Sequence, residues 1–447
     1  MLRNCIFISF FIAIISIGVS AQDFDTYFTN QTLRLDYIFA GSATQQAVYL
    51  DGMMKQEHWA GRRSQLSELP YWGNGQIEVR DAATGLLIYC NSFSSLFQEW
   101  VNTPEAAVVA RSYQNTFLVP MPKHEVDVSI TLCNTYHKPV ATLTHRVDPT
   151  NILIRNQTNA PQVIKLHKGG SYSECINIAI VSEGYSDESK ATFVRDAKLA
   201  AKTILAHEPF KSYAKKFNIV AVFQPSVDDG VSVPRYNDWK QTAFGSHYST
   251  FYSDRYLTTS SLEAVHDAIG TVPFEQIILL VNTERYGGGG IYNNITLCTS
   301  DHPFSPVGFV HEFGHSFAGL ADEYDYGEEE DPTYPPDIEP WEPNITTLVD
   351  FAAKWQYMLP SGVKVPTAPD ALERDNDLRR IWSRLTPEQK AQINSKLGVY
   401  EGAGYRAKGV YRPVQECRMR INECEEFCPV CTRAIERMTY YCTGALE

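Results

Sequence analysis

The sequence lacks an internal repeat and, beyond its first 21 residues, any apolar stretch long enough to cross a membrane. A repeat architecture and a multi-span membrane protein are therefore excluded. Positive charge is also scarce, because 39 Lys and Arg residues stand against 52 Asp and Glu residues, for a net charge of −13. Nucleic acid and anionic membranes both require clustered Lys and Arg, so neither is expected as a partner.

The first 21 residues differ from this soluble composition. Arg3 gives a short positive start, residues 6–19 are almost entirely apolar, and Val19-Ser20-Ala21 supplies small residues before Gln22. This order predicts a signal peptide at residues 1–21. The alternative is an uncleaved anchor, for which the apolar run is short. We therefore expect a secreted, periplasmic or cell-surface protein that makes no membrane contact after signal cleavage.

Nine cysteines remain once the predicted signal peptide is removed. In an oxidising compartment some of them should pair as disulfides, and the odd number leaves at least one free. Four near the C-terminus, Cys424, Cys428, Cys431 and Cys442, could instead hold a structural zinc ion. The secreted setting favours disulfides over that cluster.

At 447 residues the chain is too long for one compact core. Residues 22–160 contain alternating apolar and polar positions, as at 33–39, 76–80 and 125–130, with Gly and Asn between them. No long helical stripe appears in this part. The pattern predicts an antiparallel, sandwich-like β domain.

Residues 161–447 show a different pattern. Apolar strands are expected at 175–181, 217–223 and 276–281. Ser186 is expected to cap a helix that runs to about His207, and Ser260 with Glu263 to open another that ends at Ile269. Strands that alternate with helices predict a mixed α/β domain with helices packed on the sheet.

The strongest functional signal is the segment Phe309–Ala318, whose pattern indicates a helix. His311 and His315 are four residues apart and therefore project from one face, one turn apart. That spacing lets two imidazole nitrogens reach one Zn²⁺. Glu312 can act on a water at the metal without binding the metal itself. The alternative is a helix with two hydrogen-bonded histidines and a solvated Glu.

A catalytic zinc ion needs a third protein ligand and one open position. Gly319 can end the helix, so a carboxylate just beyond it can fold back under the metal. Asp322 is the first candidate, and Glu323 and Asp325 are the alternatives. A layout that takes Glu339 from a second helix is disfavoured, because prolines surround it.

Four consecutive glycines, Gly287–Gly290, follow the strand at 276–281. Without a following helix start and a Lys they make a poor phosphate site. Two interpretations remain, a flexible loop and an exposed edge strand on which an extended peptide pairs. Under the second, Gly288 and Gly289 bind substrate.

The order His311-Glu312-x-x-His315, a turning glycine and a nearby ligand resembles the metzincin arrangement, although Gly319 and Asp322 each come one residue late. The string His311–Tyr324, with Gly404-Tyr405 and Lys408–Pro413, resembles the bacterial IgA-peptidase family of metallopeptidases over about residues 176–442. The preceding β domain also fits that family's layout. The resemblance implies a metzincin-like zincin domain, zinc, endopeptidase activity and secretion. It does not by itself make immunoglobulin the substrate.

Under this resemblance Cys417–Arg420 matches the Met-turn, a bend that places Met419 beneath the zinc site as an apolar floor. The alternative for Met419 is simple core packing, since a Met side chain fills gaps. Residues 431–441 contain helix-forming residues, as expected for the closing helix.

The predicted enzyme is thus a zinc endopeptidase in which Glu312 takes a proton from water and returns it to the departing amine. Tyr411 or Tyr405 is a candidate for stabilising the oxyanion. One alternative is a secreted glycan- or protein-binding protein with a structural metal, which Glu312 disfavours. Another is a zinc amide hydrolase for non-peptide substrates, which the glycine-rich edge disfavours. The expected partner is a protein or peptide substrate, and the sequence does not indicate an oligomeric state.

Overall fold

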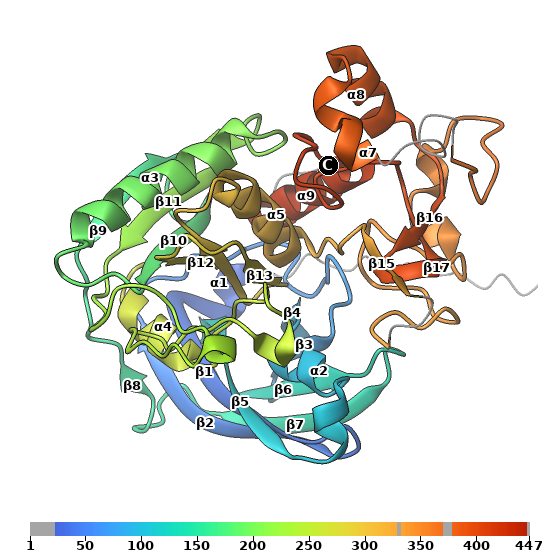
Figure 1. Ribbon diagram of the computed structural model, residues 1–447. Coiled ribbons are helices and arrows are strands. Elements are labelled where there is room, and N and C mark those ends of the chain that lie inside the picture. Colours follow the sequence, from blue (N-terminus) through green and yellow to red (C-terminus); the bar gives the residue numbers. More distant parts are fainter. Residues whose placement is uncertain (1–22, 329–331, 370–377, 445–447) are drawn as a thin grey trace, which may run out of the picture.

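The computed structural model describes residues 23–328, 332–369 and 378–444 (Figure 1). The predicted signal peptide at 1–21 lies outside the described residues. None of the helices in the described part of the chain has the length and apolar character needed to span a bilayer.

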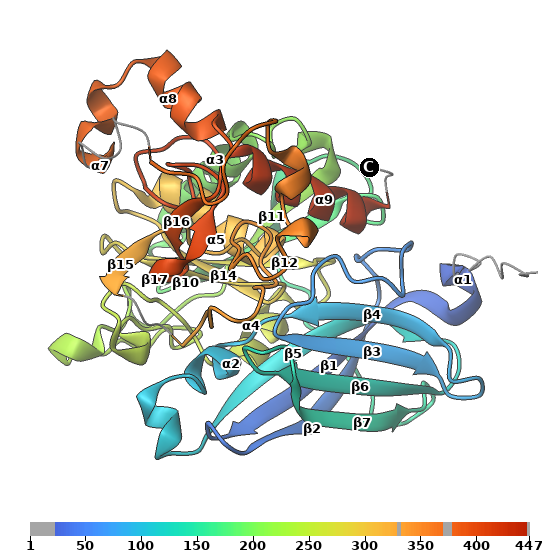
Figure 2. The same ribbon diagram turned by 90° about the vertical axis from the view of Figure 1, so that its right-hand side faces the viewer.

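The N-terminal part contains two four-stranded sheets, ordered β5-β1-β2-β8 and β4-β3-β6-β7. Their strands are β1 (Phe28–Gly41), β2 (Gln46–Gln56), β3 (Gly75–Asp81), β4 (Leu87–Phe93), β5 (Arg111–Pro122), β6 (Val126–Cys133), β7 (Pro139–Val147) and β8 (Arg155–Asn156). Figure 2 shows the two sheets facing each other. The three stretches of alternating residues fall in β1, β3 and β6.

The alternation explains why these two sheets pack. Leu35 and Tyr37 of β1 are fully buried and share one core with Val79 of β3 and Val128 of β6. Successive side chains of a strand point to opposite faces, so a strand of alternating apolar and polar residues offers one apolar face to the other sheet. The structure therefore has the sandwich-like arrangement that the sequence predicts.

The C-terminal part is built on a six-stranded sheet of order β13-β14-β12-β10-β11-β9. Its strands are β9 (Val163–Lys168), β10 (Ile176–Glu183), β11 (Phe217–Val222), β12 (Gln276–Val281), β13 (Gly288–Ile291) and β14 (Ile295–Thr299). The four inner strands run parallel, and β9 and β13 are antiparallel edges. Both faces of β10 and β12 are buried, as their continuous apolar runs predict.

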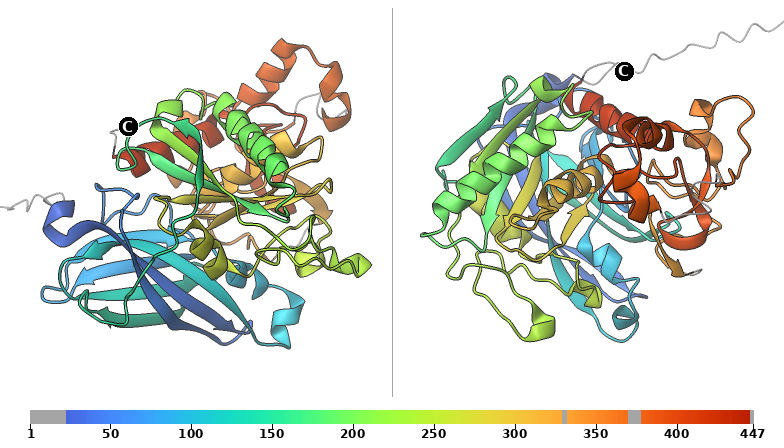
Figure 3. Two further views of the ribbon diagram at one scale, coloured as in Figure 1. Left: turned by 90° about the vertical axis from the view of Figure 1, so that its left-hand side faces the viewer. Right: turned by 45° about the horizontal axis from the view of Figure 1, so that its top comes forward.

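Helices cover both faces of this sheet (Figures 1 and 3). The main ones are α3 (Lys190–Ala206), α4 (Leu262–Ile269), α5 (Ser305–Ala318) and α9 (Pro429–Thr443). Buried residues of α3, α5 and α9 share one core, and those of α4 lie in a second core. A small sheet of β15 (Asp325–Glu328), β17 (Tyr405–Arg412) and β16 (Tyr400–Ala403) lies beside α5, and α7 (Leu378–Ile381) and α8 (Pro387–Ser395) lie farther out.

Three predicted helix starts differ from the observed ones by one to four residues. The α3 helix begins at Lys190, because the Ser186 hydroxyl donates to Asp229 instead of capping a helix. The α4 helix begins at Leu262 without a side-chain cap, so the predicted capping box is not formed. The α5 helix begins at Ser305, four residues early, with a proline in its first turn, where the missing N–H costs nothing.

The expectation of disulfides is also wrong for the described residues, whose nine cysteines are all free thiols. The Sγ atoms of Cys417 and Cys431 are 3.9 Å apart, about twice the ~2.05 Å of a disulfide bond. The disfavoured alternative, a zinc cluster of Cys424, Cys428, Cys431 and Cys442, is not formed either. Cys428 and Cys431 lie together with Cys417 and Glu323, without Cys424 or Cys442.

Candidate active site and metal centre

A cavity of about 840 Å³ lies between the two parts of the chain. The C-terminal part contributes β13, the cavity side of α5 and the segment after it. The sandwich contributes Ser94, Gln98 and Glu99 around the short helix α2 (Leu96–Trp100). The sequence does not indicate a role for the β domain, because contacts between segments far apart in the chain leave no local pattern in the sequence. The structure shows that it forms one wall of the cavity.

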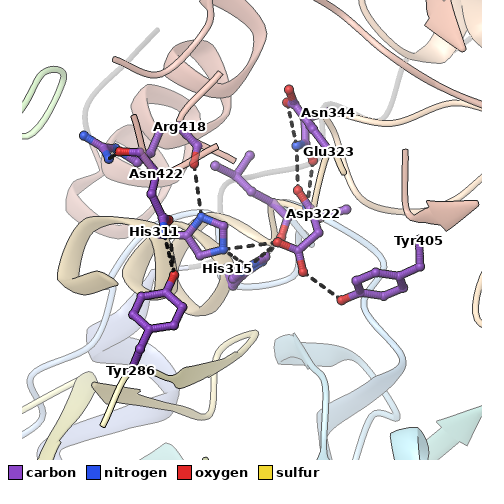
Figure 4. A network of polar contacts seen from close by, with 11 residues as sticks. Tyr286, His311, His315, Asp322, Glu323, Asn344, Tyr405, Arg418 and Asn422 are labelled. Atoms are coloured by element: carbon purple, nitrogen blue, oxygen red, sulfur yellow. Dashed lines mark hydrogen bonds and ion pairs between the residues drawn. The ribbon is translucent and has the colours of Figure 1, made fainter. Parts of the chain in front are cut away.

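Three predicted ligands meet at this cavity (Figure 4). His311 and His315 project from one side of α5, with their Nε2 atoms 3.1 Å apart. Gly319 ends the helix in a left-handed conformation at φ +61°, so the chain turns back. Asp322 Oδ1 then lies 3.1 Å from His311 Nε2 and 3.3 Å from His315 Nε2. The structure thus brings together the two histidines of the predicted spacing and the first choice of third ligand.

The outer hydrogen bonds of the two rings fix which nitrogen faces inward. His311 Nδ1 lies 3.1 Å from the Arg418 carbonyl oxygen, and His315 Nδ1 lies 2.5 Å from that of Leu320. A carbonyl oxygen only accepts, so each Nδ1 carries a proton. In the neutral rings each Nε2 then carries no proton and has a lone pair free to bind a cation. Two such lone pairs and a carboxylate oxygen converge on one point, and this donor set fits a divalent cation.

When no cation is bound, protonation of the histidines can partly neutralise the Asp322 carboxylate. Burial favours the neutral His315 ring, but the Asp322 carboxylate outweighs burial and raises the pKa of His315 to about 9. Burial also opposes the charge on Asp322, yet the two histidines hold the pKa of this carboxyl below its usual range. Metal and protons therefore compete for the same atoms.

Glu312 lines the cavity beside the ligand pair. Burial raises the pKa of its carboxyl, and the charges of His311 and His315 oppose that rise. It does not belong to the set of converging ligand atoms. Glu312 thus lies next to the converging ligand atoms without being one of them.

The glycine run forms a strand, not a flexible loop. A Cβ at Gly288 would lie 2.5 Å from Glu312 Oε1, and one at Gly290 would lie 2.3 Å from the Glu312 carbonyl oxygen. The glycines therefore let β13 approach α5 closely. The outer edge is partly covered, because Gly288 donates to Arg255 and accepts from Leu257. Gly288 thus provides space at the site but has no free backbone groups.

The turn at Cys417–Arg420 packs directly under the ligand helix. Met419 is fully buried, and a Cβ placed on Gly314 of α5 would lie 3.2 Å from its Sδ. The carbonyl of Arg418 accepts from His311, and that of Met419 accepts from the Glu323 amide at 2.8 Å. The predicted Met-turn segment therefore lies next to the candidate metal ligands, and it hydrogen-bonds to His311 and to the residue after Asp322.

Of the two candidate tyrosines, Tyr405 contacts the site. Its hydroxyl donates to Asp322 Oδ2 at 2.8 Å. Tyr411 pairs through its backbone with Thr346 and is not among the described residues that line the cavity, so its place does not support a substrate contact. The two lie on the same short strand, and only the tertiary structure distinguishes them.

The other carboxylates considered as ligands point elsewhere. Glu323 turns to the three cysteines, and Asp325 accepts from the Gly327 amide. Glu339 accepts from the Asp350 amide, so the rejected layout with a distant Glu is not formed.

Two histidines one helical turn apart, a carboxylate beyond a glycine turn and an adjacent glutamate form a site of the kind found in metal-dependent hydrolases. A sequence profile described as IgA Peptidase M64 matches residues 164–439, and one described as Peptidase M64 N-terminus matches residues 23–143. The chain belongs to the IgA peptidase M64 family and is a metallo-type peptidase that acts on protein or peptide substrates. A search of curated proteins finds no match.

Proposed function

We propose that the protein is a secreted, zinc-dependent endopeptidase with a metzincin-like site. The observation that carries this proposal is the convergence of His311 Nε2, His315 Nε2 and Asp322 Oδ1 at 3.1–3.3 Å, with both Nδ1 atoms bound to carbonyls. Zinc is the divalent ion that most often takes two imidazoles and a carboxylate in hydrolases. Secretion is supported by the charge and hydropathy of residues 1–21.

Bound zinc would supply Lewis-acid polarisation of the scissile carbonyl and acidify a water molecule. Glu312 is the general base of this chemistry, since its carboxyl lines the cavity beside the ligands and its pKa is raised by burial. It then returns the proton to the departing amine. Tyr405 holds Asp322 through Oδ2 and so leaves Oδ1 for the metal.

The substrate is proposed to be an extended peptide lying along β13. Alternate residues of a strand present their backbone groups to the same edge, so Gly290 faces the edge that Gly288 faces. Because Gly288 is already engaged by the segment 255–257, a peptide would pair at Gly290. The opposite wall, with Gln98 and Glu99, comes from the sandwich. This placement explains why a β domain precedes the catalytic part.

The decisive experiment is digestion of casein by the mature protein and by Glu312→Gln, with the zinc content of both measured. We expect cleavage by the first alone, at internal bonds, and equal zinc content in both. Intact casein with cleavage of an acetylated small-molecule amide would instead support a non-peptide amide hydrolase. Equal binding of casein by both proteins, with no cleavage of either substrate, would support a binding protein.

A further inference from the structure

A second group of side chains with metal-binding chemistry lies behind the Met-turn. Glu323, Cys417, Cys428 and Cys431 each offer one ligand atom, and all four atoms lie within 4.8 Å of one another. All four residues are buried, with no more than 1 % of any of them exposed. The group shares no residue with the set of His311, His315 and Asp322.

These residues come from three segments that the fold brings together. Glu323 follows Asp322 in a segment that is neither helix nor strand, and the two side chains make contacts on different sides of it. Asp322 therefore faces the histidines while Glu323 faces the cysteines. Cys417 begins the Met-turn segment, and Cys428 and Cys431 form a Cys-x-x-Cys pair at the start of α9.

Backbone amides already point at the sulfur atoms. The Cys428 amide donates to Cys417 Sγ at 3.2 Å, and the Cys431 amide donates to Cys428 Sγ at 3.4 Å. Asn344 holds one carboxylate oxygen of Glu323, Oε1, at 2.9 Å. Such donors stabilise thiolate and carboxylate ligands and fix their orientation.

One atom of the group has no partner of its own. Glu323 Oε2 is fully buried and makes no hydrogen bond. A buried carboxylate oxygen without a partner is costly, and the one thiol that donates to this carboxylate, Cys431 to Oε1 at 3.1 Å, is a weak donor. A cation bound at this point would satisfy it.

We propose that Glu323, Cys417, Cys428 and Cys431 bind a second zinc ion at a closed, four-coordinate structural site. Sulfur-rich tetrahedral sets select zinc, and a site whose four positions all come from protein holds the metal for structure and not for catalysis. The thiol protons leave as the ion binds. Buried Arg412 and Arg418 act electrostatically on Glu323 and Cys417 and offset part of the negative charge.

A redox dithiol fits these cysteines less well. Reactive Cys-x-x-Cys thiols are partly exposed, so that a partner thiol can attack them. Cys428 and Cys431 are both fully buried and packed with Cys417. A dithiol would also leave no role for a third thiol and a carboxylate at the same point.

The position of this second site affects the site of His311, His315 and Asp322. It ties the segment that carries Asp322 to the Met-turn and to α9, and so adds to the hydrogen bond from Glu323 N–H to Met419 and to the core that the Met-turn shares with α9. Glu323 is thus a positioning residue for Asp322. The inference does not depend on zinc at the catalytic site, since it rests on a separate set of ligands.

The test uses the mature protein purified under reducing, anaerobic conditions. In the His311→Ala/His315→Ala variant the catalytic ligands are gone, so metal measured there reports on the cysteine site alone. We expect this variant to retain about one equivalent of zinc. After replacement by Co²⁺ it should show the intense thiolate-to-cobalt charge-transfer band in the near ultraviolet. Absence of both zinc and this band would overturn the proposal.

Cys428→Ser and Cys424→Ser, each made in that double-histidine variant, form a matched pair. Cys424 is equally buried and nearby but lies outside the four ligands. The first should lose the charge-transfer band and the second should keep it. Because Cys428→Ser could unfold, a batch of the parent purified without any reductant is also tested by mass spectrometry after alkylation in denaturant. Three alkylated ligand cysteines support the site, and a disulfide among them would refute it.

Discussion

The backbone amide of Glu323 donates a hydrogen bond to the carbonyl oxygen of Met419 at 2.8 Å. This bond joins the segment that carries Asp322 to the turn that packs under the helix of His311 and His315. On the same turn, the Arg418 carbonyl accepts from His311. The candidate metal ligands are therefore supported by a segment about a hundred residues away in the chain.

Glu312→Gln should abolish most of the peptidase activity and leave the metal in place. The amide cannot accept a proton, and positioned general acid–base groups contribute roughly 10²- to 10⁴-fold to rate. Measurement of kcat on a peptide substrate, with zinc content by elemental analysis, checks both parts. Retention of more than a tenth of wild-type kcat would exclude Glu312 as the base.

Tyr405→Phe should weaken metal binding by about 10- to 100-fold, because it removes the hydroxyl that orients Asp322. Tyr411→Phe is the matched control, a tyrosine of the same strand whose side chain does not line the cavity. Zinc affinity measured by competition with a chelator should separate the two variants. Equal affinities would remove Tyr405 from the supporting shell.

The stability of the metal-free protein should fall as pH rises from about 6.5 to about 9. The folded-state pKa of His315 is raised to about 9 by Asp322, so the pair stabilises the fold fully below the unfolded pKa and loses this contribution as the ring deprotonates. Zinc affinity should rise over the same window, because protons leave the ligands. Urea unfolding with and without zinc tests the two opposite slopes.

In metal-free His315→Gln protein, the free energy of unfolding should change much less between about pH 6.5 and about pH 9. If the slope in that variant equalled that of wild type, another group would be responsible.

Gly290→Ala should destabilise the protein by ~1–3 kcal/mol, the range for overpacking a filled space. The added Cβ would lie 2.3 Å from the Glu312 carbonyl oxygen and 2.7 Å from His315 Cβ. Gly308→Ala in α5 is the control, since a Cβ there meets nothing within 4 Å. That change should be neutral or stabilising by up to ~1 kcal/mol. The free energy of unfolding in urea distinguishes them, and equal values would contradict close packing at Gly290.

Much of the fold could be read from the sequence, because its signals are local. Alternating residues identified strands of the sandwich, and apolar runs identified β10, β11 and β12. Helix starts were less accurate, since Ser186 found a tertiary partner in Asp229. A serine that could cap a helix can instead bond to any partner that the folded chain brings near. Which partners are near depends on the tertiary structure and cannot be predicted from the local sequence.

What the sequence determined by itself is the chemistry of the first site. A four-residue spacing on a helix fixes two imidazoles on one face, and a glycine allows the left-handed turn that brings Asp322 back, whatever surrounds them. Only the tertiary structure decided which tyrosine holds Asp322, that the sandwich forms a cavity wall, and that Cys417 joins Cys428 and Cys431 in place of Cys424 and Cys442. These contacts join segments far apart in the chain, and burial and packing across the whole core, not local spacing, place them together.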